Sequence, residues 1–191
     1  MPEPPTTILA FETPADLRDW LAQHHKAASE LWVRIYKNES GRRSVAWADC
    51  VVEAIAYGWI DGQKKPLDGD SYLQRLSPRN PRSNWSIKNR AHAERLIAEG
   101  RMTEAGQHQV DAAKADGRWE NAYAGSSQGE VPQDFLDALE GDPAAKAFFA
   151  TLDRKNLYSI YYRLHTAKSP ETRTKRLKSI LEQLARGQGF H

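Results

Sequence analysis

The chain has 191 residues, of which 40% are hydrophobic and 27% are charged, and its formal net charge at pH 7 is +2. This apolar content suffices for one core, or for one core with a smaller satellite, and the charged fraction is ordinary for a folded protein. No stretch approaches the roughly 18 consecutive apolar residues of a membrane span. The first residues are proline-rich and lack the basic segment and apolar run of a secretory signal. We therefore expect a cytoplasmic protein with no membrane span.

The predicted elements begin after a loose leader over residues 1–13, whose prolines exclude a helix interior. Thr13-Pro14 then starts a helix, because threonine suits the capping position and proline the first helical position. The segment Leu31–Lys37 alternates, with Leu31, Val33 and Ile35 on one side and Trp32, Arg34 and Tyr36 on the other, and this pattern predicts a strand. A helix follows over Val45–Tyr57, and it places Cys50, the only cysteine, on its apolar face. We expect this thiol to be buried in the core.

Two strands come next, Trp59–Leu67 and Ser71–Ser77, joined around Asp68-Gly69 in a pattern typical of a hairpin. Ser83 is expected to cap a helix that runs to Glu99, and a second helix is expected over Glu104–Ala115.

Residues 124–130 are rich in glycine and serine and predict a linker. Four helices are expected after it, with starts at Pro132, Asp142-Pro143, Asp153 and Ser169-Pro170. The fold class is therefore α+β. We expect a β-α-β-β-α domain over residues 14–123, followed by a helical domain over residues 131–191.

The usual catalytic signatures are absent from the sequence: it has no G-x-S-x-G, no P-loop and no G-x-G-x-x-G. The six histidines have no ligand spacing to one another or to the cysteine, so neither a metal nor a cofactor is expected. The sequence assigns no catalytic residue and favours a protein without enzymatic activity.

The first candidate site surrounds the expected helix start at Ser83. Arg79 and Arg82 precede it, where free backbone N–H groups and the helix dipole favour an anion, and arginine binds phosphate or carboxylate through two parallel hydrogen bonds. We expect the following residues to bind the ligand: Trp59, Asp61, Lys64, Arg79, Arg82, Ser83, Trp85 and Ser86. The structural alternative is that Asp61 pairs with Arg79 or Arg82 and that both tryptophans belong to the core.

The second candidate is a basic partner face in the last predicted helix, formed by Lys168, Arg173, Lys175 and Arg176. Residues 102–150 carry nine acids and three bases, whereas residues 151–191 carry three acids and nine bases. The basic helices therefore face either the acidic segment of the same chain or an anionic partner. A nucleic acid bound to the basic helices is a less favoured alternative.

Two further alternatives remain open. Asp61 beside Lys37 or Lys64 would make an acid/base pair in an enzyme. The acidic 102–150 segment would suit the capture of a cationic peptide.

Several short motifs follow one another along the chain: Trp32…Lys37…Ser40-Gly41, Glu53-Ala54…Gly58-Trp59-Ile60-Asp61-Gly62, Ser77-Pro78-Arg79…Ser83-Asn84-Trp85-Ser86…Asn89, Gly100-Arg101-Met102, Asp116-Gly117-Arg118-Trp119…Ala122-Tyr123, Val131-Pro132 and Ala167-Lys168…Glu171-Thr172-Arg173…Arg176. In this order they resemble the YdeI/OmpD-associated family, also called bacteriocin-protection proteins, over residues 15–187. The resemblance implies a role in bacterial resistance to antimicrobial peptides or envelope stress. It implies no catalytic residues. The expected partner is an anionic small molecule or a protein.

Overall fold

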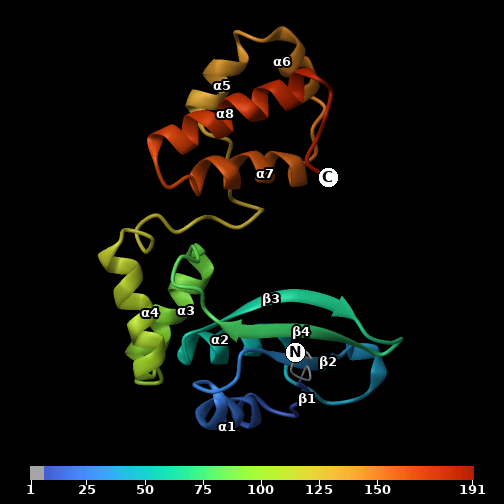
Figure 1. Cartoon of the computed structure of the whole chain (residues 1–191). Helices are drawn as coiled ribbons and strands as arrows, with labels where there is room; N and C mark the ends of the chain where they lie inside the picture. Colours follow the sequence, from blue (N-terminus) through green and yellow to red (C-terminus); the bar gives the residue numbers. More distant parts are fainter. Residues whose placement is uncertain (1–6) are drawn as a thin grey trace, which may run out of the picture. The chain divides into compact units, whose positions relative to one another are not determined.

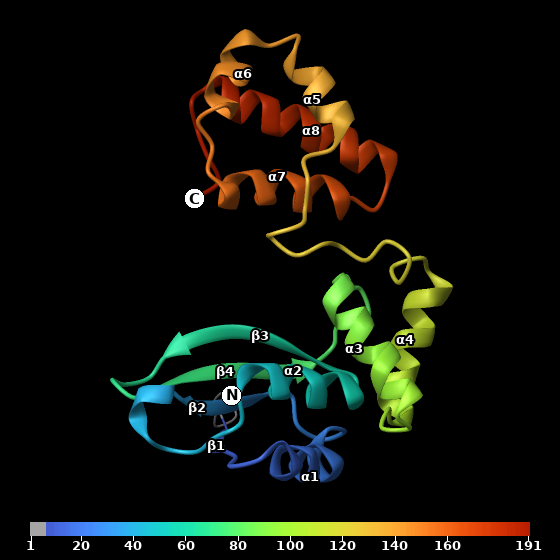
Figure 2. The same cartoon turned by 180° about the vertical axis from the view of Figure 1, so that it is seen from behind.

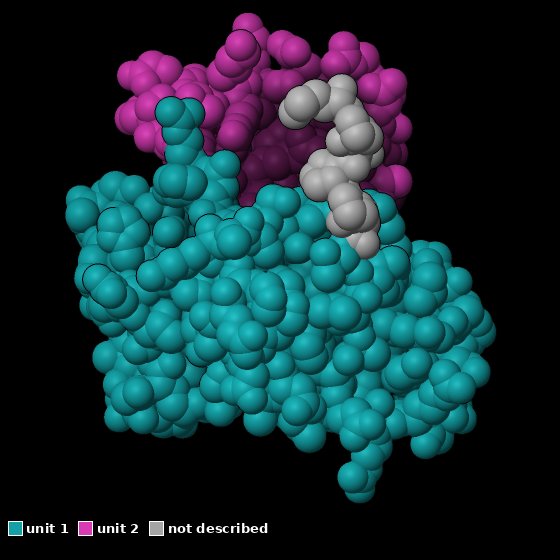
Figure 3. Space-filling model, turned by 60° about the horizontal axis from the view of Figure 1, so that its bottom comes forward, with its two compact units in different colours: residues 1–83, 89–119 teal, residues 84–88, 120–191 magenta. Residues whose placement is uncertain are grey.

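The computed structural model describes residues 7–191 of the chain (Figure 1). They form two compact units. The first comprises the residues up to Ser83 together with Asn89–Trp119, and the second comprises Asn84–Lys88 together with Glu120–His191 (Figure 3). The α+β class and the order of an N-terminal α/β part followed by a helical part are confirmed.

The first unit contains a four-stranded mixed sheet in the order β1-β2-β4-β3. The strands are β1 (Ile8–Ala10), β2 (Leu31–Tyr36), β3 (Trp59–Pro66) and β4 (Ser71–Pro78). Strand β1 is parallel to β2, and the other neighbours are antiparallel. The predicted hairpin is therefore present, and its second strand lies between β3 and β2.

Strand β1 differs from the expected loose leader. Ile8 and Ala10 pair with Trp32 and Arg34 of β2, so part of the segment 1–13 is ordered by the sheet edge; residues 1–6 lie outside the described part of the chain. Three residues are too few to show an alternating pattern. Their extended conformation is stabilised by pairing with a strand more than twenty positions away in the sequence. Hydrophobic periodicity within a segment does not identify such a partner.

Two helices pack on the same face of the sheet, α1 (Pro14–His24) and α2 (Trp47–Ala56), and Figure 2 shows them beside the strands. Thr13 caps α1 as predicted, because its Oγ1 accepts from the backbone N–H of Asp16 at 3.3 Å while the Asp16 carboxylate accepts from Thr13 N at 2.9 Å. Leu17 and Leu21 are fully buried against the apolar residues of β2. Burial of this apolar face stabilises the first unit.

A buried carboxylate joins α1 and α2 to the chain before α4 (Glu104–Ala115). The Glu53 side chain is only 3% exposed, and it accepts hydrogen bonds from Arg18 at 2.7 and 2.9 Å and from Arg101 at 2.7 Å. A buried charge of this kind requires such partners, because it has lost its hydration. The three side chains therefore fix the relative positions of the segments that carry them.

Helix α3 (Ile87–Ala98) begins three residues later than predicted, and Ser83 does not cap it. The reason is a pairing with a distant segment: Ser86 forms a parallel bridge with Tyr123, Tyr123 N donates to Trp85 O at 2.9 Å, and Ile87 N donates to Tyr123 O at 2.8 Å. The backbone before Ile87 is thus extended. The helix start on which the first candidate site rested is not present at Ser83.

The second unit is built from α5 (Gln133–Leu139), α6 (Pro143–Phe149), α7 (Arg154–His165) and α8 (Pro170–Ala185). The caps that the sequence indicated are present, because Asp142, Asp153 and Ser169 each accept from the backbone N–H three residues later. The buried core of these helices consists of Phe135, Leu139, Ala145, Ile160, Leu164, Ile180 and Leu184.

The segment expected to be a linker is attached to α7. Ala124 N donates to the Tyr161 hydroxyl at 2.8 Å, and the Tyr158 hydroxyl donates to Ala124 O at 3.2 Å. A Cβ added to Gly129 would lie 2.5 Å from Tyr161 Cδ1, so only glycine allows this approach. Residues 124–130 therefore belong to the second unit. The boundaries of independently folding domains remain a prediction.

Candidate anion-binding site

The residues of the first candidate site lie in different environments. Trp59 is 1% exposed and donates from Nε1 to His25 O at 3.2 Å, and Arg79 is 3% exposed. Asp61 is half-buried and accepts from the indole Nε1 of Trp47 at 3.2 Å. Trp59 and Arg79 are therefore buried, whereas Asp61 is partly open to solvent.

The remaining residues of that set are divided between the two units. The Lys64 ammonium lies 3.9 Å from the centre of the Tyr72 ring, and the Ser83 carbonyl accepts from Arg118. Arg82 is exposed in the first unit, whereas Trp85 and Ser86 belong to the second unit. The ligand-binding role of these eight residues remains a prediction.

The four residues of the predicted basic face also have different roles. Arg173 binds the Asp134 carboxylate through both terminal nitrogens, one of them at 2.9 Å, and so ties α8 to α5. The hydrogen bond from Arg173 lowers the pKa of Asp134. Lys168 and Lys175 are exposed, and Arg176 lines a pocket between α7 and α8.

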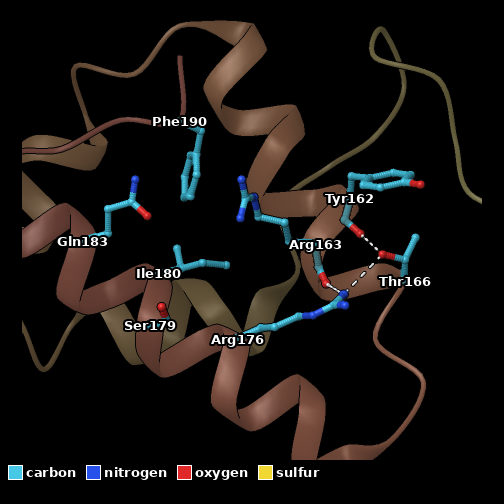
Figure 4. A pocket seen from close by; sticks show the side chains of 8 residues that line it. All are labelled: Tyr162, Arg163, Thr166, Arg176, Ser179, Ile180, Gln183 and Phe190. Atoms are coloured by element: carbon cyan, nitrogen blue, oxygen red, sulfur yellow. Dashed lines mark hydrogen bonds between the residues drawn. The ribbon is translucent and has the colours of Figure 1, made fainter. Parts of the chain in front are cut away.

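This pocket has a volume of about 260 Å³ (Figure 4). Its lining residues come from the end of α7, the middle of α8 and the C-terminal segment: Tyr162, Arg163, Thr166, Arg176, Ser179, Ile180, Gln183 and Phe190. Ile180 is a core residue and forms an apolar base, whereas the other lining side chains are polar, charged or aromatic. A pocket with an apolar base and a few convergent polar groups is the usual form of a small-ligand site.

Arg176 is held in place by the end of α7. Its Nη1 donates to Arg163 O at 2.7 Å and lies 3.4 Å from Thr166 Oγ1, as the dashed lines in Figure 4 show. Thr166 is itself fixed, because its hydroxyl donates to Tyr162 O at 2.6 Å. The described contacts use only Nη1 of this guanidinium. Its Nε and Nη2 therefore retain hydrogen atoms that can be donated to a ligand.

Arg163 contributes a second cationic side chain to the lining of the pocket. Its guanidinium carbon lies 4.6 Å from the centre of the Phe190 ring, a cation–π contact. Phe190 is anchored by its backbone N, which donates to Asn156 Oδ1 at 2.7 Å, and Gln183 Nε2 donates to Gly189 O at 2.7 Å. The C-terminal segment thus fixes one side of the pocket.

The charge of the pocket is uncompensated by its own lining. No acidic residue lines it, and within residues 7–191 neither Arg163 nor Arg176 forms an ion pair with a carboxylate. Two guanidinium groups with a hydroxyl from Ser179 suit a phosphate or a carboxylate, because charge-assisted hydrogen bonds from arginine are among the strongest in proteins.

Sequence reasoning identified Arg176 and missed Arg163 and Phe190. Antiparallel packing of two helices joined by a short turn would pair Arg163 with Arg173, which is equally distant from the turn at 167–169, so this rule does not identify the contact of Arg163 with Arg176. Phe190 has no signal either, because its position depends on contacts of the chain after α8.

Tyr158 and Tyr161 contact Ala124 through their hydroxyls. Within residues 7–191, no three histidine, cysteine or acidic side chains are grouped as a metal site. No helix in the described chain has the length and apolarity needed to cross a bilayer.

Residues 9–109, more than half of the chain, match the family model described as "Domain of unknown function (DUF8412)". The chain belongs to the DUF8412 family. This match contains β2, β3, β4 and all but the first residue of β1, together with the first three α-helices and the first half of α4.

A second model, described as "Bacteriocin-protection, YdeI or OmpD-Associated", matches residues 128–187 of the DUF8412 chain. The resemblance expected over residues 15–187 is therefore confirmed only for this C-terminal part. Its near full-length extent is wrong, because a different model matches residues 9–109. The matched C-terminal part contains every residue that lines the α7–α8 pocket except Phe190. No curated protein and no solved structure matches the DUF8412 chain.

Proposed function

We propose that the second unit binds a small anionic ligand, a phosphate or a carboxylate, in the α7–α8 pocket, and that this binding serves resistance to bacteriocins or other antimicrobial peptides. One observation carries the proposal: the guanidinium groups of Arg163 and Arg176 line the same cavity, and no acid lines it.

The pocket is prepared for binding before a ligand arrives. Arg176 is held by two acceptors at the end of α7, Arg163 O and the hydroxyl of the capping residue Thr166, and Phe190 contacts the guanidinium of Arg163. Such preorganisation reduces the entropy lost when a ligand orders flexible side chains. The volume of about 260 Å³ suits a small molecule and excludes a folded partner.

The cellular part of the proposal follows from the description of the matched family, bacteriocin protection. Because the lining of the pocket is cationic, we propose that a cationic peptide is not its ligand and that protection works through a small anion. We place this role in the cytoplasm and assign no catalytic step to it. The single buried cysteine, Cys50, is compatible with that reducing compartment.

The binding test is a calorimetric titration of the whole chain with inorganic phosphate and, separately, with acetate. We expect Arg176→Gln and Arg163→Gln each to weaken binding by about tenfold or more, since a hydrogen bond to a charged group contributes about 1.5–3 kcal/mol. Lys178→Gln is the matched control, because Lys178 is an exposed cation on α8 that does not line the pocket.

The site is rejected if neither phosphate nor acetate binds the wild type. It is also rejected if Lys178→Gln weakens binding as much as the two arginine variants do. The nucleic-acid alternative predicts tight binding of oligonucleotides that all three variants weaken and that added salt abolishes. The protective role is tested by survival of bacteria that express the chain when they are treated with a bacteriocin. It is rejected if expression gives no protection, or if Arg176→Gln protects as well as the wild type.

A further inference from the structure

The α7–α8 pocket is larger than the anionic group proposed to occupy it. Its volume of about 260 Å³ equals that of about nine water molecules in the liquid, at about 30 Å³ each. Inorganic phosphate has five non-hydrogen atoms and acetate has four, so either ion would leave about half of the pocket unfilled. A ligand that fills the pocket has on the order of nine non-hydrogen atoms, which is smaller than a drug-sized molecule.

Part of the pocket lining is apolar, and an inorganic anion does not use it. Ile180 belongs to the core of the second unit, and Phe190 is half-buried and packs against the same core. Both side chains line the pocket, and Figure 4 shows the ring of Phe190 pointing toward Ile180. An apolar group that covers them gains free energy, because water is released from the ligand and from the lining. We therefore expect the ligand to carry a compact apolar group next to its charge.

The apolar part of the lining adjoins a guanidinium and an aromatic ring. The guanidinium carbon of Arg163 lies 4.6 Å from the centre of the Phe190 ring, and both residues line the pocket. Guanidinium groups stack on aromatic faces, and aromatic rings attract one another through edge-to-face contacts. A saturated ring of the same size gains free energy from burial alone. The lining therefore favours an aromatic group over an aliphatic one.

The charged part of the lining suits a carboxylate. The described contacts of Arg176 use Nη1, which leaves the hydrogen atoms of Nε and Nη2 for a ligand. Elsewhere in the chain, Arg18 holds the Glu53 carboxylate through this same pair of nitrogens, at 2.9 and 2.7 Å. The pair matches the two oxygens of a carboxylate. Glu182, the acid nearest in sequence to the lining residues of α8, is exposed and does not line the pocket.

We infer that the ligand of this pocket is a small aromatic carboxylate, a single ring that directly bears the carboxylate. The carboxylate is bound by Arg176, and the ring packs on Ile180 and Phe190 beside the guanidinium of Arg163. The inference rests on the proposed function, because it takes the pocket as an anion site and adds the aromatic ring. Benzoate is the simplest such compound, and its nine non-hydrogen atoms match the volume of the pocket. It has one rotatable bond between ring and carboxylate, so little conformational entropy is lost on binding.

The test is a calorimetric titration of the whole chain with inorganic phosphate, acetate, benzoate and cyclohexanecarboxylate. The last is the matched control ligand, because it has as many non-hydrogen atoms as benzoate but no π-face. We expect benzoate to bind at least about tenfold more tightly than acetate, since its ring becomes buried. We expect it to bind about threefold more tightly than cyclohexanecarboxylate, through its contacts with the aromatic ring and the guanidinium of the lining.

Substitutions then place the ligand in this pocket. Arg176→Gln should weaken benzoate and acetate by about tenfold each, since both lose the same guanidinium. Phe190→Leu should remove most of the preference for benzoate over cyclohexanecarboxylate, because leucine keeps an apolar surface without a ring. Phe149→Leu is the matched control and should keep that preference, since Phe149 packs against the same core but does not line the pocket.

The inference and the proposed function fail in different ways. If phosphate or acetate binds, but benzoate binds no more tightly than acetate, the anion site stands and the aromatic ligand is wrong. The aromatic ligand is also wrong if cyclohexanecarboxylate binds as tightly as benzoate, or if Arg176→Gln leaves the affinity for benzoate unchanged. If neither phosphate nor acetate binds the wild type, the anion site itself fails, and the inference fails with it. The comparison of ligands needs only the wild type, so it decides the result even if Phe190→Leu fails to fold by circular dichroism.

Discussion

Replacement of Glu53 by glutamine should destabilise the first unit by about 3 kcal/mol. The carboxylate accepts three hydrogen bonds from Arg18 and Arg101 at 2.7–2.9 Å, and a glutamine oxygen can keep only part of them. Its NH₂ group would face guanidinium donors, and the two positive charges would lose the anion between them. Each charged hydrogen bond contributes about 1.5–3 kcal/mol, and we discount the sum because the arginine side chains, 42% and 37% exposed, can regain water.

The assay is urea unfolding followed by tryptophan fluorescence, which reports mainly on the first unit because Trp85 is the only one of the six tryptophans in the second. With a slope of about 2 kcal/mol/M, the midpoint should fall by about 1.5 M. Glu99→Gln is the control, since Glu99 also binds Arg101 but is 42% exposed. A loss below about 0.5 kcal/mol, or a loss equal to that of the control, would refute the reasoning that burial gives this carboxylate its importance.

Three more predictions concern single side chains. Burial raises the pKa of the Cys50 thiol to about 12, so its modification by a disulfide reagent at about pH 8 should be about a thousandfold slower than in urea, where the thiol is exposed. Gly106→Ala should lower stability by about 2 kcal/mol in thermal unfolding, because the new Cβ would lie 2.4 Å from Ala56 O between α4 and α2. Arg173 lowers the pKa of Asp134, so Asp134→Asn should reduce stability at neutral pH, and the difference from the wild type should vanish as the pH falls through and below the ordinary aspartate range near about 3.9.

Each of these has a clear contrary outcome. Rapid modification of Cys50 in the folded chain would mean that the thiol is not buried. A Gly106→Ala variant as stable as the wild type would mean that α2 and α4 separate easily at this point. An Asp134→Asn variant whose deficit persists at acidic pH would show that charge pairing with Arg173 is not the cause of its effect.

Local signals in the sequence were sufficient for most of the fold. The starts of α1, α6, α7 and α8 follow from a capping side chain within three residues of the N–H group that it binds, and the hairpin follows from a turn between two alternating segments. These features depend on neighbours along the chain. A single sequence therefore contains the information needed to predict them.

The features that the sequence did not predict depend on contacts between residues far apart in the chain. The late start of α3 depends on Tyr123, and the order of β1 depends on β2. The attachment of Ala124 to α7 depends on two tyrosines. The α7–α8 pocket was only half predicted for the same reason: Arg176 stood out by charge, whereas Arg163 becomes relevant only when the two helices lie side by side. The acidic segment 102–150 and the basic segment 151–191 form an ion pair between Asp134 and Arg173.

Residues 84–88 belong to the second unit, although residues 89–119, which follow them, belong to the first. This division affects how the second unit can be isolated or transferred to another protein. The C-terminal family model begins at residue 128, yet the unit contains Asn84–Lys88 and the stretch from Glu120 onward. A truncated protein that starts at residue 128 would lack Tyr123, and one that starts at residue 120 would leave the backbone of Tyr123 without its partners, Trp85 and Ile87. The second unit is therefore not one continuous segment, and truncation of the chain at a single position does not isolate it with all of its partners. A transplant also needs the segment 84–88, supplied in cis or added as a separate peptide.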